Sequence, residues 1–330
     1  MANLRAGLIG LGMMGRHHAR VLGSLDGVEL VAVADPGGDR FGVARERTLV
    51  ASITELIARG IDYCMVAVPT GLHEEVALEL AEAGVHTMIE KPISHDTESA
   101  ERITAAFKSK GLIGGVGHIE RYNSALQQAR VRIENGDLGD IYQVATRRQG
   151  PFPGRIADVG VVKDLGTHDF DLTAWVTQQR YTSVSAQTVF KSGRAHEDLV
   201  AVVGKLNGGA ATNHLVNWLS PLKERTTVIA GERGAFVVDT LTADLTYHAN
   251  GQVETTWDEI SQFRGVSEGD VVRYAFPKPE PLRTEHETFR DAVRDGDTSR
   301  IVTMEEGLEA LRVVEAVLES ASTQTGVALR

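Results

Sequence analysis

Short, continuous apolar runs alternate with helix-like segments from the N-terminus to Gly117. The runs are "AGLIG", "VELVAVAD", "DYCMVAVP", "VHTMIE" and "LIGGVG", and they have the unbroken apolar character of strands that are buried on both faces. The segments between them carry helix signals. In "DTESAERITAAFKSKG", for example, Asp96 is placed as an N-cap and Gly111 follows the last turn. Strands that alternate with helices at this spacing predict a parallel, doubly wound sheet.

The pattern changes after Gly117. Alternating apolar and polar segments follow, and "NGG", "GERG" and "ANGQ" interrupt them as turns, which predicts a largely antiparallel sheet. Helical periodicity occurs at 121–135, 164–177, 284–295 and 304–321. We therefore expect an α/β protein with a doubly wound domain at 1–118 and an α+β domain at 119–330.

Composition narrows the class of protein. At 330 residues the chain is long enough for roughly two domains. Its net charge of -11 argues against binding to nucleic acid or to an anionic membrane, because both need a basic patch. A single cysteine, Cys64, and an N-terminus without a signal-like apolar segment predict a reduced, cytoplasmic protein with no transmembrane span.

A glycine-rich turn directly follows the first apolar run. Its pattern is G-x-G-x-x-G, which permits a tight turn, a close approach of a pyrophosphate and close packing of helix on strand. The next strand ends at Asp35, at the spacing where a carboxylate binds a ribose 2′-hydroxyl. We expect NAD rather than NADP, because this carboxylate repels a 2′-phosphate. The loop residues expected to bind the cofactor are Gly10, Gly12, Met13, Met14 and Gly15.

Two adjacent histidines, His17 and His18, follow the third glycine. Neighbouring residues on a helix point in different directions, and no paired ligand motif accompanies them. We therefore expect no metal site here, and we expect one of the two rings to pack near the cofactor.

Two later strands end in polar residues. Ligands of open parallel sheets bind at the carboxyl ends of the strands. Lys91 leaves a buried strand where the nicotinamide would lie, and its ammonium group can hydrogen-bond a substrate hydroxyl and favour its ionised form. A surface turn is the alternative for either segment. The residues expected at this edge are Val68, Pro69, Thr70, His73, Glu90 and Lys91.

The segment 161–172, "VVKDLGTHDFDL", carries one lysine, three aspartates and one histidine. On a regular α-helix it forms two neighbouring stripes. The apolar stripe comprises Leu165, Leu172 and Val176, and the second stripe comprises Asp164, His168, Asp171 and Trp175. A stripe that borders the core favours a cleft, where a histidine beside an aspartate can exchange a proton near neutral pH. A solvated face is the alternative, and Lys163 and Asp169 are expected at the surface.

Three segments resemble the glucose–fructose oxidoreductase, inositol dehydrogenase and MocA family: "GLIGLGMMGRHHA", "VAVPTGLHEEVALELAEAGVHTMIEKPIS" and "VKDLGTHDFDL". The resemblance implies an N-terminal Rossmann domain and a C-terminal domain with an open antiparallel sheet, through which homodimers or homotetramers form. It implies oxidation or reduction of a sugar or cyclitol hydroxyl with NAD(P). It also implies a catalytic set in which His168 is the acid/base, while Lys91 and Asp164 polarise and position the hydroxyl.

Three further segments resemble the branch of this family that contains UDP-N-acetylglucosamine 3-dehydrogenases: "GGVGHIERYNSA", "RRQGPFPGRIADVGVV" and "NWLSPLKERTTVIAGERGAFVVD". A nucleotide diphosphate needs arginines, which Arg147, Arg148 and Arg155 can supply, although a solvated loop is the alternative for each. Lys163 and Ser124 depart from the branch, where an aliphatic residue and a proline are usual. The substrate contacts implied are His118, Arg121, Asn123, Arg155, Asp164 and His168.

The expected activity is hydride transfer between NAD and a sugar carbon, such as C3 of UDP-N-acetylglucosamine. The only partners expected are the sugar or nucleotide-sugar substrate and further copies of the chain. Three alternatives stay open: an inositol or free-sugar dehydrogenase, a glycosidase that uses NAD without net redox change, and a sensor of NAD or sugar without catalysis. The joint presence of Lys91, Asp164 and His168 argues against a sensor.

Overall fold

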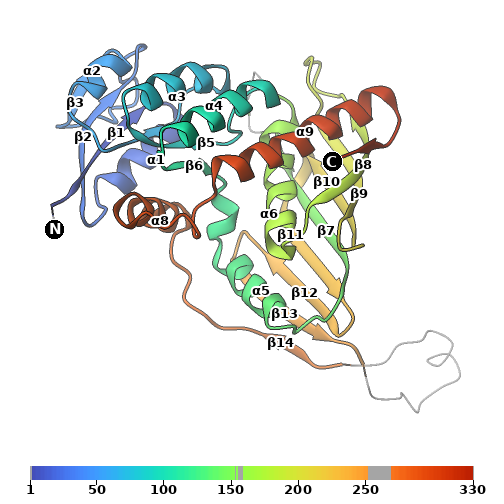
Figure 1. The fold of residues 1–330 in the computed structure, drawn as a ribbon. Coiled ribbons are helices and arrows are strands. Elements are labelled where there is room, and N and C mark those ends of the chain that lie inside the picture. Colours follow the sequence, from blue (N-terminus) through green and yellow to red (C-terminus); the bar gives the residue numbers. More distant parts are fainter. Residues whose placement is uncertain (1, 153, 155–158, 252–268, 330) are drawn as a thin grey trace, which may run out of the picture. The chain divides into compact units, whose positions relative to one another are not determined.

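The computed structural model describes residues 2–152, 154, 159–251 and 269–329. It divides into two compact units (Figure 1). Unit 1 comprises Met1–Ile119 and Pro279–Glu315, and unit 2 comprises Glu120–Lys278 and Ala316–Arg330. The sequence places everything after residue 118 in one domain, whereas in the structure the segment Pro279–Glu315 packs with the N-terminal residues.

Unit 1 contains a six-stranded parallel sheet in the order β3-β2-β1-β4-β5-β6. The order reverses between β1 and β4, and right-handed connections then place helices on both faces of the sheet. The predicted doubly wound sheet is therefore confirmed. Its strands are β1 (Leu4–Ile9), β2 (Val28–Ala34), β3 (Thr48–Val50), β4 (Tyr63–Val66), β5 (His86–Glu90) and β6 (Gly114–Gly117). Its helices are α1 (Met13–Leu22), α2 (Ile53–Ile57), η1 (Thr70–Leu72), α3 (His73–Glu82), α4 (Thr97–Ser109), α8 (Pro281–Asp295) and the first part of α9 (Met304–Thr323).

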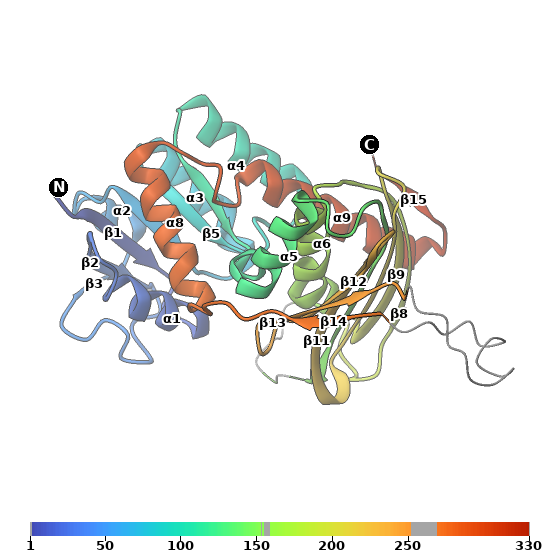
Figure 2. The ribbon, with the colours of Figure 1, turned by 90° about the horizontal axis from the view of Figure 1, so that it is seen from below.

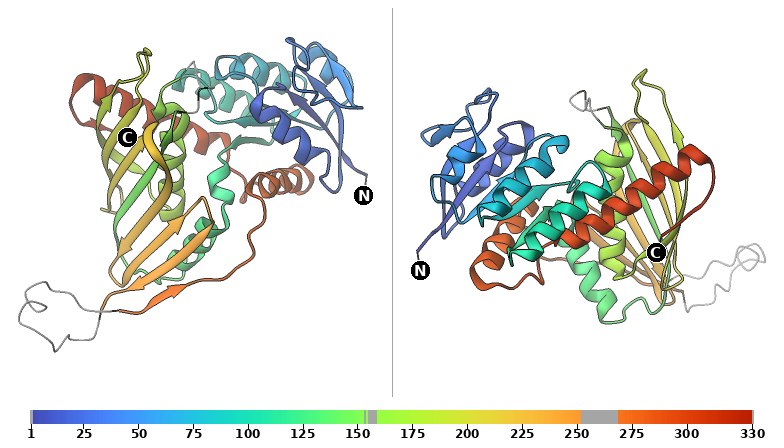
Figure 3. Two further views of the ribbon diagram at one scale, coloured as in Figure 1. Left: turned by 180° about the vertical axis from the view of Figure 1, so that it is seen from behind. Right: turned by 45° about the horizontal axis from the view of Figure 1, so that its top comes forward.

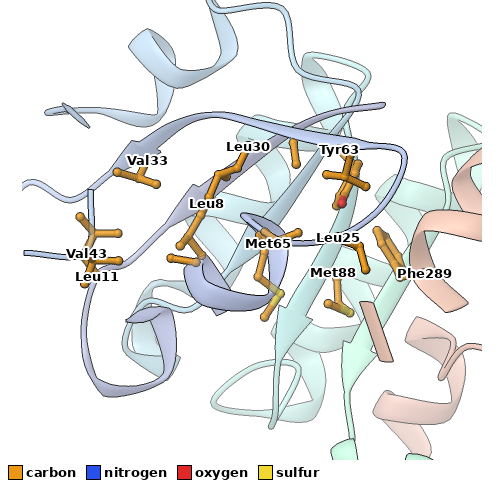
Figure 4. Close-up of a cluster of buried hydrophobic side chains, with 14 of the residues drawn as sticks. Leu8, Leu11, Leu25, Leu30, Val33, Val43, Tyr63, Met65, Met88 and Phe289 are labelled. Carbon is orange, nitrogen blue, oxygen red and sulfur yellow. The ribbon is translucent and has the colours of Figure 1, made fainter. Parts of the chain in front are cut away.

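Helix α8 belongs to this unit although it follows unit 2 in the chain. It packs beside α1, and Figure 2 shows it lying along the strands of the parallel sheet. The ring of Phe289 on α8 contacts that of Tyr63 on β4 edge to face, with the ring centroids 5.7 Å apart. Figure 4 shows Phe289 at one end of a cluster of buried side chains that includes Leu8, Tyr63 and Met65 of the strands. Helix α8 is thus part of the core of unit 1.

The predicted helix signals are confirmed where the structure describes them. The carboxylate of Asp96 accepts a hydrogen bond of 2.8 Å from the Ser99 amide at the start of α4. Gly111 follows the helix with a φ of +64°, a conformation that glycine adopts without strain. Cys64 lies in β4 and is fully buried. None of the helices in the described ranges has both the length and the apolar character needed to cross a membrane.

Unit 2 contains a nine-stranded sheet in the order β14-β13-β12-β11-β7-β10-β9-β8-β15. All its pairs are antiparallel except β7 with β10, so the mainly antiparallel sheet is confirmed. Its strands are β7 (Ile141–Pro151), β8 (Tyr181–Val189), β9 (Leu199–Leu206), β10 (Ala211–Asn217), β11 (Leu219–Gly231), β12 (Gly234–Asp239), β13 (Asp244–Ala249), β14 (Val271–Arg273) and β15 (Val327–Ala328).

Helices cover one face of this sheet. The helical segments are η2 (Ile119–Tyr122), α5 (Ser124–Glu134), η3 (Val162–Gly166) and α6 (Thr167–Thr177). Leu126 of α5 and Leu172 of α6 meet Val144 and Phe236 of the strands in one buried cluster. Figures 2 and 3 show α5 and α6 on the same side of the strands. Alternate strand residues face these helices, and the others face the opposite side.

Candidate functional site

Four parallel strands of unit 1 end in register at one edge of the sheet. Ile9 of β1 pairs with Val66 of β4, Val66 with Ile89 of β5, and Ile89 with Val116 of β6. The reversal of strand order lies between β1 and β4, where doubly wound sheets bind their ligands. The segments that continue from these four ends therefore form the candidate cofactor site.

The three glycines of the predicted loop have different surroundings. At Gly10, where φ is +94°, a Cβ would lie 2.5 Å from the backbone carbonyl of Ala67 after β4. At Gly15 a Cβ would lie 1.9 Å from the carbonyl oxygen of Gly10. At Gly12 a Cβ would meet nothing within 4 Å. Two glycines thus allow backbone segments to touch, and the third leaves open space.

Helix α1 begins at Met13, and its N-cap residue Gly12 has no side chain to cap the first amides. The first amides of a helix lack intrahelical partners and carry the positive end of the helix dipole. Open space in front of such amides fits a pyrophosphate. The residues of this loop therefore fit the predicted dinucleotide, and Met14 and the exposed Met13 stand at the same helix end.

Asp35 follows β2 and joins two backbone segments. One carboxylate oxygen accepts a hydrogen bond of 2.8 Å from the Leu11 amide, and the other accepts one of 2.8 Å from the Gly37 amide. Each oxygen retains a further acceptor position. The carboxylate is thus fixed beside the glycine loop, where a ribose hydroxyl can still donate to it.

The loop after β4 contains the half-buried Val68 and Thr70 and the exposed Pro69. His73 is buried beneath it, with its ring nitrogens each 3.0 Å from a carbonyl oxygen, those of Val68 and Pro92. Burial lowers the pKa of His73, and a neutral ring can donate to only one of the two carbonyls. In the structure His73 ties the loop after β4 to the loop after β5.

Glu90 is the last residue of β5, and Lys91 follows it directly. One Glu90 carboxylate oxygen lies 2.8 Å from Nε2 of His18 on α1, and the other accepts a 3.1 Å hydrogen bond from the Lys91 amide. Burial raises the pKa of Glu90, but the hydrogen bond with His18 and the positive charge of Lys91 hold it below its usual value. His118 is buried directly after β6, whose Gly117 pairs with Glu90.

The helix that carries Asp164 and His168 in unit 2 is not a regular α-helix throughout. It begins with the π-helical turn η3, and α6 continues from Thr167. The spacing of one α-helical turn between Asp164 and His168 is therefore wrong, because a π turn is wider. The Asp164 side chain is buried, whereas His168 and Lys163 are half-buried. Turns of this kind occur often at functional sites.

Asp169 is buried, and its predicted place at the surface is wrong. It is 1% exposed, and its carboxylate accepts a 2.7 Å bond from Arg148 of β7 and a 3.0 Å bond from the Thr146 hydroxyl. Arg148 also donates to Glu120 at 2.8 Å. Burial would lower the pKa of Arg148, but these two carboxylates raise it, so the guanidinium stays charged. Arg148 is thus a buried cation of β7 whose guanidinium is held by Asp169 and Glu120.

Asp171 lies two residues after Asp169 on α6. Its carboxylate receives bonds of 2.6 and 2.9 Å from the Arg121 guanidinium, with both side chains buried. The Asn123 amide donates to the Thr240 carbonyl, and its oxygen accepts from the Ala125 amide to cap α5. These contacts position helices, and substrate contacts from Arg121 and Asn123 stay a prediction. The predicted substrate residue Arg155 lies outside the described residues.

One arginine of the sheet was missed by sequence reasoning. Arg225 of β11 pairs with Arg148 across the sheet, so both face α6. Its guanidinium lies 3.6 Å from Glu120, and its side chain is 34% exposed. By contrast, Arg147 is 59% exposed and, as the neighbour of Arg148 on the strand, points to the other face. Side chains along β7 and β11 point alternately to the two faces of the sheet. This alternation is the sequence signal that places Arg148 and Arg225 on one face and Arg147 on the other.

The lysine, the aspartate and the histidine of the predicted catalytic set thus lie on two different units. Lys91 stands at the carboxyl edge of the parallel sheet, and Asp164 and His168 stand on the η3–α6 helix. In the parts of the chain that the structure describes, no three His, Cys, Asp or Glu side chains are arranged to hold a metal ion.

The curated proteins that are similar in sequence include two dehydrogenases. Over 216 residues, 64% of this chain and 66% of the relative, the chain is 32% identical to UDP-N-acetylglucosamine 3-dehydrogenase of Acidithiobacillus ferrooxidans. Over 192 residues, 55% of this chain and 56% of the relative, it is 31% identical to scyllo-inositol 2-dehydrogenase (NAD(+)) of Bacillus subtilis. The matched stretch spans less than two thirds of either relative's length.

Solved structures match over nearly the whole chain. The UDP-N-acetylglucosamine 3-dehydrogenase GnnA of Acidithiobacillus ferrooxidans has a TM-score of 0.85 at 27% identity, covering 98% of this chain and 99% of that one. The WlbA dehydrogenase of Bordetella pertussis, solved in complex with NADH and UDP-GlcNAcA, has a TM-score of 0.80 at 25% identity, covering 99% of each chain.

The contrast between Gly12 and Gly15 generates a prediction. We expect Gly15→Ala to lower the free energy of unfolding by about 1–3 kcal/mol, because the new methyl group collides with the Gly10 carbonyl. We expect Gly12→Ala to change stability by less than about 0.5 kcal/mol and to weaken NAD binding roughly tenfold, because its methyl group occupies the phosphate approach. Urea unfolding and calorimetric NAD titration measure both effects. Wild-type NAD affinity in Gly12→Ala would contradict the assigned phosphate position.

Two family models match the chain. The model described as "Oxidoreductase family, NAD-binding Rossmann fold" matches residues 4–118, which contain the glycine loop, Asp35 and Lys91. The model described as "GFO/IDH/MocA C-terminal domain" matches residues 126–237, which contain Asp164 and His168. Because these two models together match more than half of its residues, the chain belongs to the NAD-binding GFO/IDH/MocA family of oxidoreductases.

Proposed function

We propose that the protein is an NAD-dependent dehydrogenase or ketoreductase that acts on C3 of a nucleotide sugar such as UDP-N-acetylglucosamine. The observation that carries the proposal is the position of Lys91, which directly follows β5 at the edge that also holds the glycine loop. The similarity to UDP-N-acetylglucosamine 3-dehydrogenase supports the choice of substrate class.

Three side chains have separate roles in the reaction. Bound NAD supplies the nicotinamide ring that accepts or returns the hydride. Lys91 donates a hydrogen bond to the reacting hydroxyl and favours its ionised form. The His168 imidazole takes the hydroxyl proton in oxidation and returns it in reduction, and the Asp164 carboxylate holds the ring or the hydroxyl in place.

Arg225 is the arginine that we assign to an anionic part of the substrate. It faces the same side of the sheet as α6 and keeps a third of its side chain exposed. Burial, and then the charge of Arg148, lower its pKa, and an anion beside the guanidinium would act in the opposite direction by favouring its charged form. A diphosphate is an anion of the right kind for a guanidinium.

The inositol-dehydrogenase alternative keeps specific support from the 31% identity to scyllo-inositol 2-dehydrogenase. The two substrates differ in the diphosphate, which only a nucleotide sugar carries. NADH formation from UDP-N-acetylglucosamine, free N-acetylglucosamine and inositols therefore distinguishes them. The proposal expects the UDP-sugar to have the highest kcat/KM, and preference for an inositol would overturn it.

We also propose that the chain forms a homo-oligomer through the face of the unit 2 sheet opposite α5 and α6. A row of outward residues crosses this face, because Val203, Asn213, Ala145, Val228 and Val237 are successive partners across the strands. Val203 is 61% exposed, and apolar patches of this kind favour association. Light scattering measures the molar mass, and a monomer would contradict the proposal.

Removal of either reacting side chain tests the assigned chemistry. We expect Lys91→Ala and His168→Ala each to reduce kcat at least about a hundredfold while leaving the NAD dissociation constant within about threefold, because neither side chain forms the phosphate or ribose contacts. Steady-state rates and NAD titration supply the two readouts. Wild-type kcat in both variants would contradict the assignment.

The arginine assignment has its own test. We expect Arg225→Gln to raise KM for the UDP-sugar roughly tenfold and to leave KM for an unphosphorylated sugar unchanged, because only the former has a diphosphate. Arg147→Gln, on the other face of the same sheet, is the matched control and should leave both constants unchanged. Equal effects of the two variants would exclude Arg225 as the phosphate-binding arginine.

A further inference from the structure

Four ionisable side chains gather inside unit 1, behind the residue proposed to bind the substrate hydroxyl. His18 comes from α1, Glu90 from the end of β5, and Glu285 and His286 from α8. His18, Glu285 and His286 are at most 1% exposed. Burial of this many ionisable groups costs free energy. The proposed function uses none of the three buried side chains.

Hydrogen bonds connect three of these groups in a line. Nε2 of His286 lies 2.8 Å from Nδ1 of His18, and Nε2 of His18 lies 2.8 Å from a Glu90 carboxylate oxygen. The other Glu90 oxygen accepts the Lys91 amide at 3.1 Å. The line of contacts thus runs from α8 through α1 to the backbone of Lys91.

The chemistry of the groups decides where the protons lie. Glu90 accepts from His18, so His18 carries a proton on Nε2. If His18 also carried one on Nδ1, His286 would need its proton on its own Nδ1, which has no hydrogen-bond partner among the described residues. A buried donor without a partner costs about 1–3 kcal/mol. The favoured arrangement has His286 donating from Nε2 to His18, and His18 donating from Nε2 to Glu90.

We propose that His18 and His286 are positioning residues for Lys91, through a chain of hydrogen bonds in which every donor points toward the Glu90 carboxylate. The proposal rests on the proposed role of Lys91. Both donors align their dipoles with the negative charge of Glu90, and hydrogen bonds of this kind reinforce one another in a poorly solvated interior. The ionised Glu90 then fixes the Lys91 amide and keeps a negative charge beside the Lys91 ammonium.

The burial of His286 and Glu285 beside these hydrogen bonds agrees with this arrangement of protons. Burial lowers the pKa of His286 well below its usual value, so the ring is neutral as the arrangement requires. Burial, and then the charge of Glu90, raise the pKa of Glu285 well above its usual value. Neither oxygen of Glu285 has a hydrogen-bond partner in the described part of the chain. Glu285 is therefore protonated at neutral pH, and Glu90 holds the only negative charge of the four groups.

Two substitutions of His286 separate a positioning role from a packing role. His286→Leu removes the donor, and we expect kcat to fall about tenfold with the NAD dissociation constant unchanged. His286→Gln retains an N–H group near the place of Nε2, and we expect its kcat to stay within about threefold of wild type. Equal kcat in the two variants, or loss of NAD affinity in parallel with kcat, would overturn the proposal.

The proton arrangement can be measured without turnover. Nitrogen-15 chemical shifts of the histidines in the NAD-free protein, assigned with His18→Gln and His286→Gln, report which ring nitrogen is protonated. We expect each ring to carry a proton on Nε2 and none on Nδ1. A proton on Nδ1 of either ring would overturn the proposal. Failure of Lys91→Ala to reduce kcat would instead refute the proposed function, and would leave this measurement intact.

Glu285→Gln is the matched control, because an amide has nearly the shape of a protonated carboxyl group. A carboxyl group whose pKa is raised by folding favours the folded state least above its folded pKa, and it has no such cost below its unfolded pKa. We therefore expect Glu285→Gln to be more stable than wild type at about pH 8 and equally stable at about pH 4, with kcat unchanged. Lower stability at the higher pH would show that Glu285 is ionised, and the arrangement would be wrong.

Discussion

The close packing of three backbone segments at the glycine loop is the constraint on which the cofactor edge depends. A side chain at Gly10 would strike the backbone after β4, and one at Gly15 would strike the Gly10 carbonyl. Without those side chains, α1 begins directly at the carboxyl end of β1. Its free N-terminal amides then face the open space at Gly12. The same placement brings His18, one turn further along α1, to the Glu90 carboxylate. The proposed phosphate site and the proposed support behind Lys91 thus depend on one packing requirement.

The orientation of α6 in unit 2 depends on buried ion pairs. Asp169 is bonded to Arg148 and Asp171 to Arg121, from two directions around α6. A buried ion pair contributes little net stability, but loss of one partner leaves an unpaired buried charge and costs about 3–5 kcal/mol. These pairs therefore specify the rotation of α6 about its axis, and so the direction in which His168 points. The crowding of charges in "VVKDLGTHDFDL" has two origins in this account, since two aspartates orient the helix and the proposed proton chemistry is assigned to Asp164 and His168.

Much of this structure could be predicted from local pattern. Continuous apolar runs identify the strands of the parallel sheet, and glycine spacing identifies the loop, because both signals lie within a few residues. Lys91 is found by the rule that ligands meet strand ends. The burial of Asp169 could not be predicted, because its partner Arg148 is 21 positions away on a strand whose register is not known in advance. The π turn at Val162–Gly166 carries no sequence signal that we recognise.

The contacts that α8 makes with α1 are a second feature that could not be predicted from the sequence. Its contact with α1 joins residues 268 positions apart, as between His18 and His286. A local signal nevertheless exists, because Glu285 and His286 lie on the same stripe of the helix as Leu282 and Phe289. Charged residues on an apolar stripe indicate buried polar contacts. Read in this way, "LRTEHETF" would have suggested a polar cluster, although not its partners.

The central claim is that the chain transfers a hydride directly between C3 of a nucleotide sugar and NAD. Incubation with UDP-N-acetylglucosamine that carries deuterium only at C3 tests it most directly. The account predicts that NADH accumulates and that mass spectrometry finds the deuterium in it. NADH without deuterium would place the oxidation at another carbon. Turnover of the sugar without accumulation of NADH would contradict a dehydrogenase and would favour a redox-neutral reaction.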